Sequence, residues 1–284
     1  MSLRSQLGHV RRGILSACHQ RVVPLGDRGP IVTFTFDDFP QTALTAGAPI
    51  LERYGARATY YVAMSLMNKT NELGEQFRYE DLISAQSSGH EIANHTFSHL
   101  SARRAAYDEF IRDLAWGETA LLETLGIHAS RNFAYPYGEA TLEAKKRIGP
   151  RVLSSRGTCR GLNGPEVDLN LLRANRLYGD ASRGQEARQL ILENEAEKRW
   201  LIFYTHDVAA NPSPFGCTPE LLDAVCSFAA ARGARFMTVA EAVQQIAPQV
   251  SANQHPPASN HRPLERVPFA PAPTNQESER VVRQ

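Results

Sequence analysis

In the stretch Ile31 to Pro40, IVTFTFDDFP, an apolar run of strand type ends in two adjacent carboxylates. Burial of the apolar side chains stabilises a strand, whereas aspartates at its end must be solvated, hydrogen-bonded or bound to a cation. A single Asp at this place is equally well explained as the N-cap of a following helix. Because Asp37 and Asp38 are adjacent, we expect a functional site at the carboxyl end of this strand.

Two histidines, His95 and His99, follow the strand-like segment 91–94. Side chains four residues apart can both reach one ion, either on one face of a helix or across a strand-to-helix turn. The alternative is two unrelated surface or capping histidines. Two imidazoles and one carboxylate suit zinc or another divalent first-row metal, and they leave a coordination position open for the water that hydrolysis requires.

From Ile31 onward the sequence alternates between strand-like and helix-like segments. The predicted strands are 31–36, 58–62, 90–94, 131–135, 151–154, 171–177, 200–205 and 235–238. The predicted helices are 46–54, 79–87, 107–125, 139–148, 185–197, 219–232 and 239–246. Repeated units of this length imply parallel strands, in a doubly wound sheet or a barrel. Chemically important residues at the ends of at least three separate strands favour the barrel.

The composition fits one domain of ordinary size. The chain has 284 residues, of which 42% are hydrophobic and 21% charged, enough for one sizeable core. The net charge of +1 gives no reason to expect nucleic acid as a partner. The four cysteines show no C-x-x-C spacing, so we expect reduced packing residues.

We divide the chain into three regions: an N-terminal leader (1–29, with a helix as one option), a catalytic barrel (30–247) and a tail (248–284). The leader has no sustained apolar core and no membrane span, so we expect a cytoplasmic protein with a leader that packs on the barrel or touches a membrane surface. The tail is rich in Pro and polar residues and is expected to be disordered.

Four stretches resemble the motifs of the polysaccharide deacetylase family, also called the NodB-homology or carbohydrate esterase family four domain. They are, in the family's order, 35–38 (TFDD), 95–99 (HTFSH), 133–138 (FAYPYG) and 201–207 (LIFYTHD). The resemblance implies an α/β fold, a distorted (β/α)7 barrel in a single domain. It also implies metal-dependent removal of N-acetyl groups from N-acetylglucosamine units of an oligosaccharide, polysaccharide or sugar-lipid.

Each site residue then has an expected role. Asp38, His95 and His99 would hold the divalent metal, with zinc expected and cobalt, manganese or nickel as alternatives. Asp37 would accept the proton of the attacking water. The resemblance assigns the oxyanion to the backbone N–H of Tyr137, and His206 is placed to protonate the leaving amine.

The sequence departs from the family pattern at three points. Ala134 occupies the position of an Arg that pairs with the catalytic Asp, so we expect Arg173 or Arg176 to supply that charge; the alternative is that both are surface arginines. The family's fourth motif is not evident. Phe39 replaces the usual Gly after the paired aspartates.

Two other functions remain open. Two histidines and a carboxylate also hold iron(II) in oxygenases, although the second carboxylate, Asp37, argues for hydrolysis. Ala134 leaves room for an inactive carbohydrate-binding relative. The aromatic residues Tyr135, Tyr137, Tyr178 and Phe215 could form platforms for sugar rings.

Overall fold

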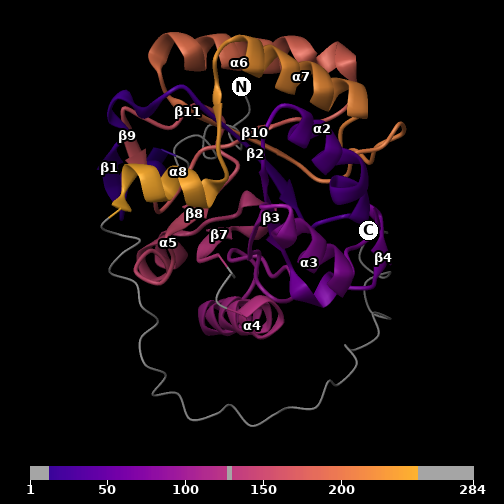
Figure 1. Ribbon diagram of the computed structural model, residues 1–284. Helices are drawn as coiled ribbons and strands as arrows, with labels where there is room; N and C mark the ends of the chain where they lie inside the picture. Colours follow the sequence, from indigo (N-terminus) through magenta and orange to yellow (C-terminus); the bar gives the residue numbers. More distant parts are fainter. Residues whose placement is uncertain (1–12, 127–129, 249–284) are drawn as a thin grey trace, which may run out of the picture. The chain divides into compact units, whose positions relative to one another are not determined.

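Seven parallel strands form the central sheet in the order β10-β11-β2-β3-β6-β7-β8, and an eighth, β12, also pairs with β2 (Figure 1). The strands are β2 (Ile31–Asp37), β3 (Ala58–Val62), β6 (Glu91–Asn94), β7 (Asn132–Ala134), β8 (Ser154–Arg156), β10 (Asn175–Arg176), β11 (Trp200–Thr205) and β12 (Arg235–Phe236). A parallel bridge between Arg156 and Leu172 links β8 to the segment that enters β10, so the sheet curls until its two edges meet. The predicted α/β fold, a distorted (β/α)7 barrel, is confirmed.

This computed structural model describes residues 13–126 and 130–248, all of which belong to one unit, Met1–Ser251. The prediction of a disordered tail lies almost entirely outside the described residues, as do the first twelve residues of the leader. Within the described ranges, no helix is both long and apolar enough to cross a membrane.

Strand β2 lies at the centre of the sheet, and all seven of its residues are buried. Side chains alternate along a strand, so Val32, Phe34 and Phe36 share one face and pack in the largest apolar cluster, with residues of the surrounding helices. The other face carries Thr33, which accepts a hydrogen bond from Trp200 Nε1 at 2.9 Å. Asp37 continues this second face, so its carboxylate projects on the same side as the threonines.

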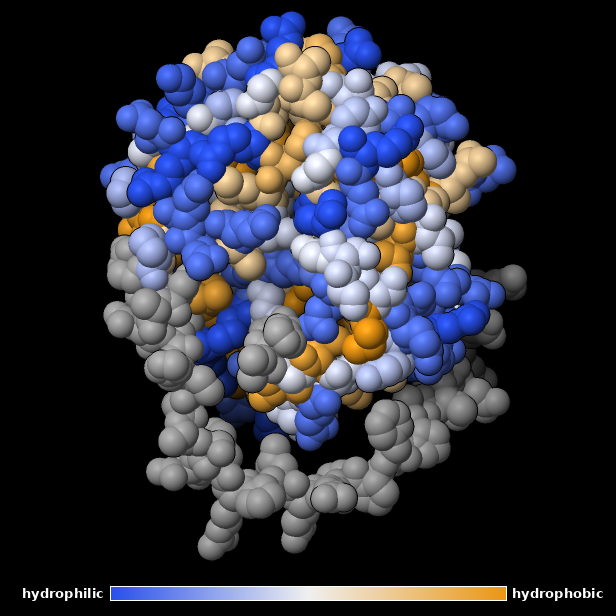
Figure 2. Space-filling view, in the orientation of Figure 1, coloured by the Kyte–Doolittle hydropathy of each residue, from blue (hydrophilic) through white to orange (hydrophobic). Residues whose placement is uncertain are grey.

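Helices surround the curled sheet (Figure 1). They are α2 (Ala48–Arg53), α3 (Tyr79–Ser87), α4 (Tyr107–Leu125), α5 (Leu142–Ile148), α6 (Gly184–Glu197), α7 (Pro219–Ala231) and α8 (Val239–Ile246). Short helical turns are η1 (Gly26–Arg28), η2 (Ala43–Gly47), η3 (Met64–Leu66), η5 (Pro136–Gly138) and η6 (Ala181–Arg183). Hydrophilic residues cover most of the face seen in Figure 2, with hydrophobic residues distributed among them, as expected for helices that bury only one side.

The structure differs from the predicted elements in several places. The strand expected at 151–154 is shifted to Ser154–Arg156. Only Asn175–Arg176 of the segment 171–177 is a strand, because Leu172 forms an isolated bridge with Arg156 and the chain changes partner before it pairs with β11. The predicted helix 46–54 begins instead with the π-helical turn Ala43–Gly47. Two small antiparallel pairs were not predicted: β1 (Val22–Pro24) with β9 (Glu166–Asp168), and β4 (Thr70–Asn71) with β5 (Gly74–Glu75).

The described part of the leader packs on the barrel. Leu15, Val23 and Leu25 are buried in the apolar clusters. Lys145 of α5, whose side chain is fully buried, donates to the carbonyl of Leu15 at 2.9 Å and pairs with Asp168 at 2.7 Å. A buried ammonium is tolerated only when it is paired in this way, so the leader and β9 together satisfy its charge.

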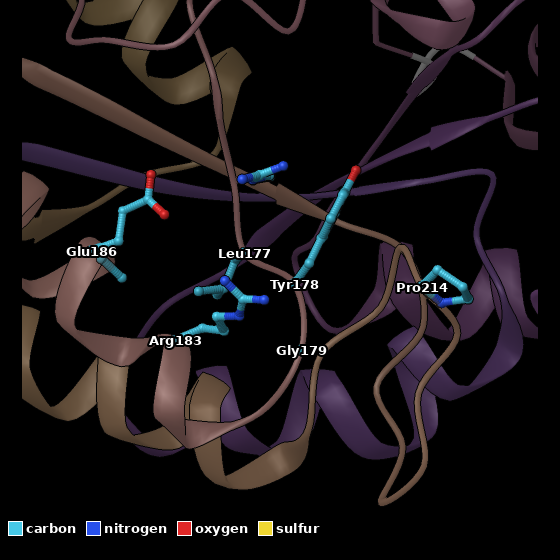
Figure 3. Close-up of a pocket in the computed structure, with 8 residues that line it drawn as sticks. Leu177, Tyr178, Gly179, Arg183, Glu186 and Pro214 are labelled. Carbon is cyan, nitrogen blue, oxygen red and sulfur yellow. The ribbon is translucent and has the colours of Figure 1, made fainter.

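A loop after β11 lies against the segment that follows β10 (Figure 3). Gly179 and Val208 each form a parallel bridge with Cys217, and the N–H of Gly179 donates to the carbonyl of Gly216 at 2.8 Å. The carboxylate of Asp207 organises this loop by accepting hydrogen bonds from the N–H and the hydroxyl of Ser213, at 2.8 and 2.5 Å. The loop therefore has a defined conformation beside the carboxyl ends of β10 and β11.

Candidate metal centre and active site

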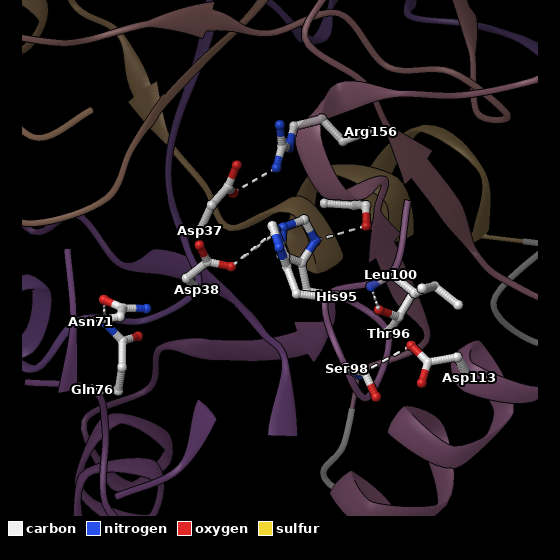
Figure 4. A network of polar contacts seen from close by, with 12 residues as sticks. Asp37, Asp38, Asn71, Gln76, His95, Thr96, Ser98, Leu100, Asp113 and Arg156 are labelled. Atoms are coloured by element: carbon white, nitrogen blue, oxygen red, sulfur yellow. Dashed lines mark hydrogen bonds and ion pairs between the residues drawn. The ribbon is translucent and has the colours of Figure 1, made fainter. Parts of the chain in front are cut away.

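The structure brings together Asp38, His95 and His99, of which Figure 4 labels Asp38 and His95. One ligand atom from each lies within 4.8 Å of the others. The Asp38 Oδ1 atom is 3.2 Å from His99 Nε2 and 3.8 Å from His95 Nε2. Asp38 follows β2 and the histidines follow β6, two strands separated only by β3. Because the strands are parallel, the segments after them emerge at the same edge of the barrel, as in other barrel sites.

Both imidazoles are neutral near pH 7. Burial, followed by the neighbouring His99, lowers the pKa of His95 to about 3, and burial lowers the pKa of His99 to about 4. The contacts with Asp38 are therefore not salt bridges. The His95 Nδ1 atom lies 2.8 Å from the carbonyl of Ala134, which can only accept, so the proton is on Nδ1 and Nε2 carries a lone pair.

These groups fit a divalent cation. Asp38 Oδ1 is buried and has no hydrogen-bond partner among the described residues. Burial raises the pKa of Asp38 to about 7, because the surrounding residues compensate the charge of this carboxylate poorly. A carboxylate and imidazole lone pairs that converge without a proton donor would be satisfied by zinc or a similar ion.

The turns that carry these groups have unusual backbone conformations. Five of the eight non-glycine residues with positive φ among the described residues lie here: Asp38 (64°), Phe39 (67°), Thr96 (62°), His99 (55°) and Tyr137 (59°). Left-handed conformations are uncommon for residues other than glycine and persist only where the surroundings enforce them. Phe39 supplies part of that enforcement, since its buried ring lies 4.4 Å from the ring of Tyr60 and 5.5 Å from that of Phe77.

Helix α4 holds the histidine turn in place. Asp113 accepts from the N–H of Ser98 through Oδ2 and from the N–H of Phe97 through its carbonyl, both at 3.0 Å. A Cβ atom at Gly117 would lie 2.4 Å from Asn94 Oδ1, so glycine is required for this close approach. These positioning residues were not predicted from the sequence. The one available signal was a glycine in the middle of a strongly periodic helix.

Asp37 does not join the metal ligands but pairs with an arginine. Its Oδ1 atom lies 2.5 Å from Arg156 Nη2, and the Arg156 side chain is 0% exposed. Burial by itself would raise the pKa of Asp37, but Arg156, followed by His95 and His206, lowers it below the usual range. The guanidinium lies over the ring of Tyr61 at 4.9 Å and over that of Tyr204 at 5.4 Å, so aromatic faces also stabilise its charge.

This arrangement corrects the prediction that Arg173 or Arg176 supplies the charge. Both are exposed, and Arg173 Nη1 instead donates to the carbonyl of Arg160 at 3.1 Å. Arg156 is the direct register partner of Ala134 on the neighbouring strand. The arginine missing at position 134 is thus replaced from the adjacent strand. That register was invisible in the sequence, where Arg156 fell just outside the predicted strand.

His206 and Tyr137 complete the rim of the cleft. His206 is half-buried, and its Nδ1 atom donates to the carbonyl of Phe215 at 3.1 Å, which leaves Nε2 available. Among the described residues, the backbone N–H of Tyr137 has no hydrogen-bond acceptor. A cleft of about 490 Å³ is lined by Asp37, Asp38, His95, His99, Tyr137 and His206, together with Glu72 and the aromatic residues Tyr178, Tyr204 and Phe215.

Three of the four predicted aromatic platforms line this cleft. Tyr137 and Phe215 are exposed, at 58% and 47%, and Tyr178 is half-buried. Tyr135, in contrast, is buried in the apolar cluster beneath α5. Glu72, on the turn between β4 and β5, also lines the cleft. It was not predicted, because it belongs to a hairpin that no sequence pattern indicated.

Asp38→Asn is expected to weaken metal binding by more than about 100-fold, since an anionic ligand becomes a neutral one. Metal content after dialysis, measured by atomic emission, checks this. Glu72→Gln is the matched control, because it removes a carboxylate that lines the same cleft but lies outside the Asp38-His95-His99 group. An Asp38→Asn protein that kept metal as well as the Glu72→Gln protein would contradict the ligand assignment.

The fold and the site define a class of protein: a curled parallel α/β barrel with a candidate Asp-His-His metal site at the carboxyl ends of its strands. The polysaccharide deacetylase family model matches residues 26–149 of this chain. A chitooligosaccharide deacetylase from Azorhizobium caulinodans is 27% identical over 157 residues, covering 54% of this chain and 70% of that protein. The matched range 26–149 contains both aspartates and both histidines, whereas Arg156 and His206 lie beyond it.

Solved structures agree on the fold. The Xyl-CE4 domain of a multidomain xylanase from the hindgut metagenome of Trinervitermes trinervoides superposes with a TM-score of 0.51 at 18% identity, over 76% of this chain and 91% of that one. The T48 deacetylase, solved with substrate, gives a TM-score of 0.51 at 16% identity, over 77% and 92%. At such low identity these likenesses concern the fold alone.

Proposed function

We propose that this protein is a metal-dependent deacetylase that removes N-acetyl groups from N-acetylglucosamine units of an oligosaccharide, polysaccharide or sugar-lipid. The observation that carries the proposal is the different surroundings of two adjacent carboxylates. Asp38 faces two neutral imidazoles, while Asp37 is held by Arg156. One carboxylate is thus suited to bind a cation and the other to handle a proton.

The residues divide the reaction between them. When bound by Asp38, His95 and His99, the metal would polarise the acyl oxygen and lower the pKa of water from about 15.7 toward roughly 7. Zinc is the expected metal, with cobalt, manganese and nickel as alternatives. Asp37 accepts the proton of the attacking water, and Arg156 keeps that carboxylate ionised until then.

The later steps fall to the rim of the cleft. The backbone N–H of Tyr137 donates to the oxyanion of the tetrahedral intermediate. His206, with Nδ1 held by Phe215, donates a proton from Nε2 to the departing nitrogen as the carbon–nitrogen bond breaks. The products are acetate and the free amino sugar.

Acetate release tests this function. The metal-loaded protein should release acetate from at least one member of a panel of acetylated chitooligosaccharides, sugar nucleotides and sugar-lipids, and a chelator should abolish the release. A protein that holds the metal and yet releases no acetate from any of them would overturn the proposal.

The other candidate functions are separated by the same panel. An iron(II) oxygenase would need oxygen, so deacetylation under nitrogen excludes it. The inactive relative was considered because Ala134 replaces an arginine, and Arg156 now provides a charge in that place. The cytoplasmic location stays a prediction from the sequence.

A further inference from the structure

A second hollow, of about 220 Å³, is shown in Figure 3 and shares a lining residue with the catalytic cleft. We call it the arginine hollow, after Arg176 and Arg183, which line it together with Tyr178, Gly179, Glu186 and Pro214. Tyr178 lines both the arginine hollow and the catalytic cleft. Along the loop after β11, Pro214 lines the hollow and its neighbour Phe215 lines the cleft. The two cavities are therefore adjacent, and the side chain of Tyr178 and the loop segment Pro214–Phe215 separate them.

The arginine hollow is lined by two positive charges that no carboxylate pairs directly, although the Asp180 carboxylate is near enough to Arg183 for an electrostatic interaction. Within the described ranges, the guanidinium groups of Arg176 and Arg183 form no hydrogen bond or ion pair. The carboxylate that lines the hollow, Glu186, is already paired with Arg160 at 3.0 Å. Asp180, which lies between Arg176 and Arg183 in the sequence, accepts hydrogen bonds from the N–H and the hydroxyl of Ser182.

Other arginines near the cleft differ in this respect. Arg103 and Arg104, on the Tyr137 side, both approach Glu139 at 3.8 Å. Arg156 is paired with Asp37. Unpaired guanidinium groups that line a cavity are well suited to bind phosphate or carboxylate, which they contact through several N–H groups at once.

The arginine hollow adjoins the part of the site that handles the leaving group. The ring of Tyr178 lies 6.0 Å from the His206 ring, and the carbonyl of Phe215 accepts from His206 Nδ1. His206 is the proposed acid for the departing amine, so the sugar, rather than the acyl group, lies on this side. A charged group attached to that sugar would extend toward Tyr178 and the arginines.

We propose that the arginine hollow binds an anionic group, a phosphate or a carboxylate, carried by the same acetylated sugar that is deacetylated in the cleft. This inference rests on the proposed deacetylase function and narrows its substrate class to anionic acetylated glycans. The partition formed by Tyr178 and the loop after β11 would then contact both the sugar and the residues that orient His206.

Matched charged and neutral substrates test the proposal. The phosphate arm compares N-acetylglucosamine 1-phosphate with the methyl glycoside of N-acetylglucosamine. The carboxylate arm compares a disaccharide of N-acetylglucosamine and glucuronate with the same disaccharide containing glucose. In at least one arm, kcat/KM should be about tenfold or more higher for the charged compound, and added salt should reduce the difference.

Variants locate the effect. Arg176→Gln/Arg183→Gln should remove the preference through a higher KM for the charged compound, with kcat/KM for the neutral compound within about twofold of the parent. The control is Arg232→Gln. Arg232 is an exposed arginine at the end of α7 that pairs with Glu195, so this variant should keep the preference for the charged compound. Equal use of charged and neutral compounds by the parent protein, or a preference that survives in the double variant, would overturn the proposal.

A failure of the deacetylase function gives a different pattern. In that case neither the charged nor the neutral compounds release acetate from the metal-loaded parent. Calorimetric titration with N-acetylglucosamine 1-phosphate and with glucuronate then tests the arginine hollow directly. Binding that is at least about tenfold weaker in the double variant supports the site, whereas no binding, or equal binding by parent and variant, excludes it.

Discussion

Asp37→Asn is expected to lower turnover by about 10²- to 10⁴-fold while metal content stays unchanged, the range typical for loss of a general base. Asparagine is nearly isosteric and can still accept from Arg156, but its side chain cannot take up a proton at neutral pH. The measurements are initial rates of acetate release and metal analysis of the same preparation.

Asp38→Asn provides the comparison, because that neighbouring substitution should remove both metal and activity. The pair of variants separates the two roles of the adjacent carboxylates. An Asp37→Asn protein that kept more than about a tenth of the parent turnover, or that lost its metal, would contradict the assignment of Asp37 as the base.

Arg156→Met is expected to destabilise the protein by about 3–5 kcal/mol near neutral pH, since it leaves the buried Asp37 carboxylate without its partner. The parent Asp37 has a lowered pKa in the folded state, so its contribution to stability is present above the unfolded pKa of about 3.9 and is lost as pH falls through the lower folded value. Denaturant unfolding at pH 7 and at pH 4 measures the loss, which should be smaller at pH 4.

Arg156→Met should also change the pH dependence of activity. Without Arg156, burial is no longer outweighed and the pKa of Asp37 rises, so the acidic limb of the pH–rate profile should move to higher pH. Asp37→Asn/Arg156→Met should recover part of the stability that Arg156→Met loses, because it removes the unpaired charge.

Arg173→Met serves as the control for an exposed arginine and should change stability by no more than about 0.5 kcal/mol. The role of Arg156 is contradicted if its substitution costs no more than that of Arg173 and leaves the acidic limb in place. The two variants also show whether Arg156, as found in the structure, or Arg173, as expected from the sequence, compensates the charge of Asp37.

Local patterns explain why much of the barrel could be predicted. Helix α4 follows from apolar residues at helical spacing and from the glycine that ends it, and β2 follows from its continuous apolar run. The predicted strand boundaries differ from the observed ones where tertiary contacts outweigh the local preference of the sequence. The segment 171–177 is predicted as one strand, yet Leu172 forms an isolated bridge with Arg156 of β8 and only Asn175–Arg176 pairs with β11.

From the sequence alone came the resemblance to the polysaccharide deacetylase family, the alternation of strands and helices, and the candidate metal ligands, because each depends on short stretches with a strong local pattern. Only the tertiary structure decided which arginine compensates Asp37 and that Arg176 and Arg183 line a hollow beside the cleft. These features depend on the register between neighbouring strands and on loops meeting from distant parts of the chain. Such long-range pairings are set by packing over the whole barrel, and no local pattern encodes them.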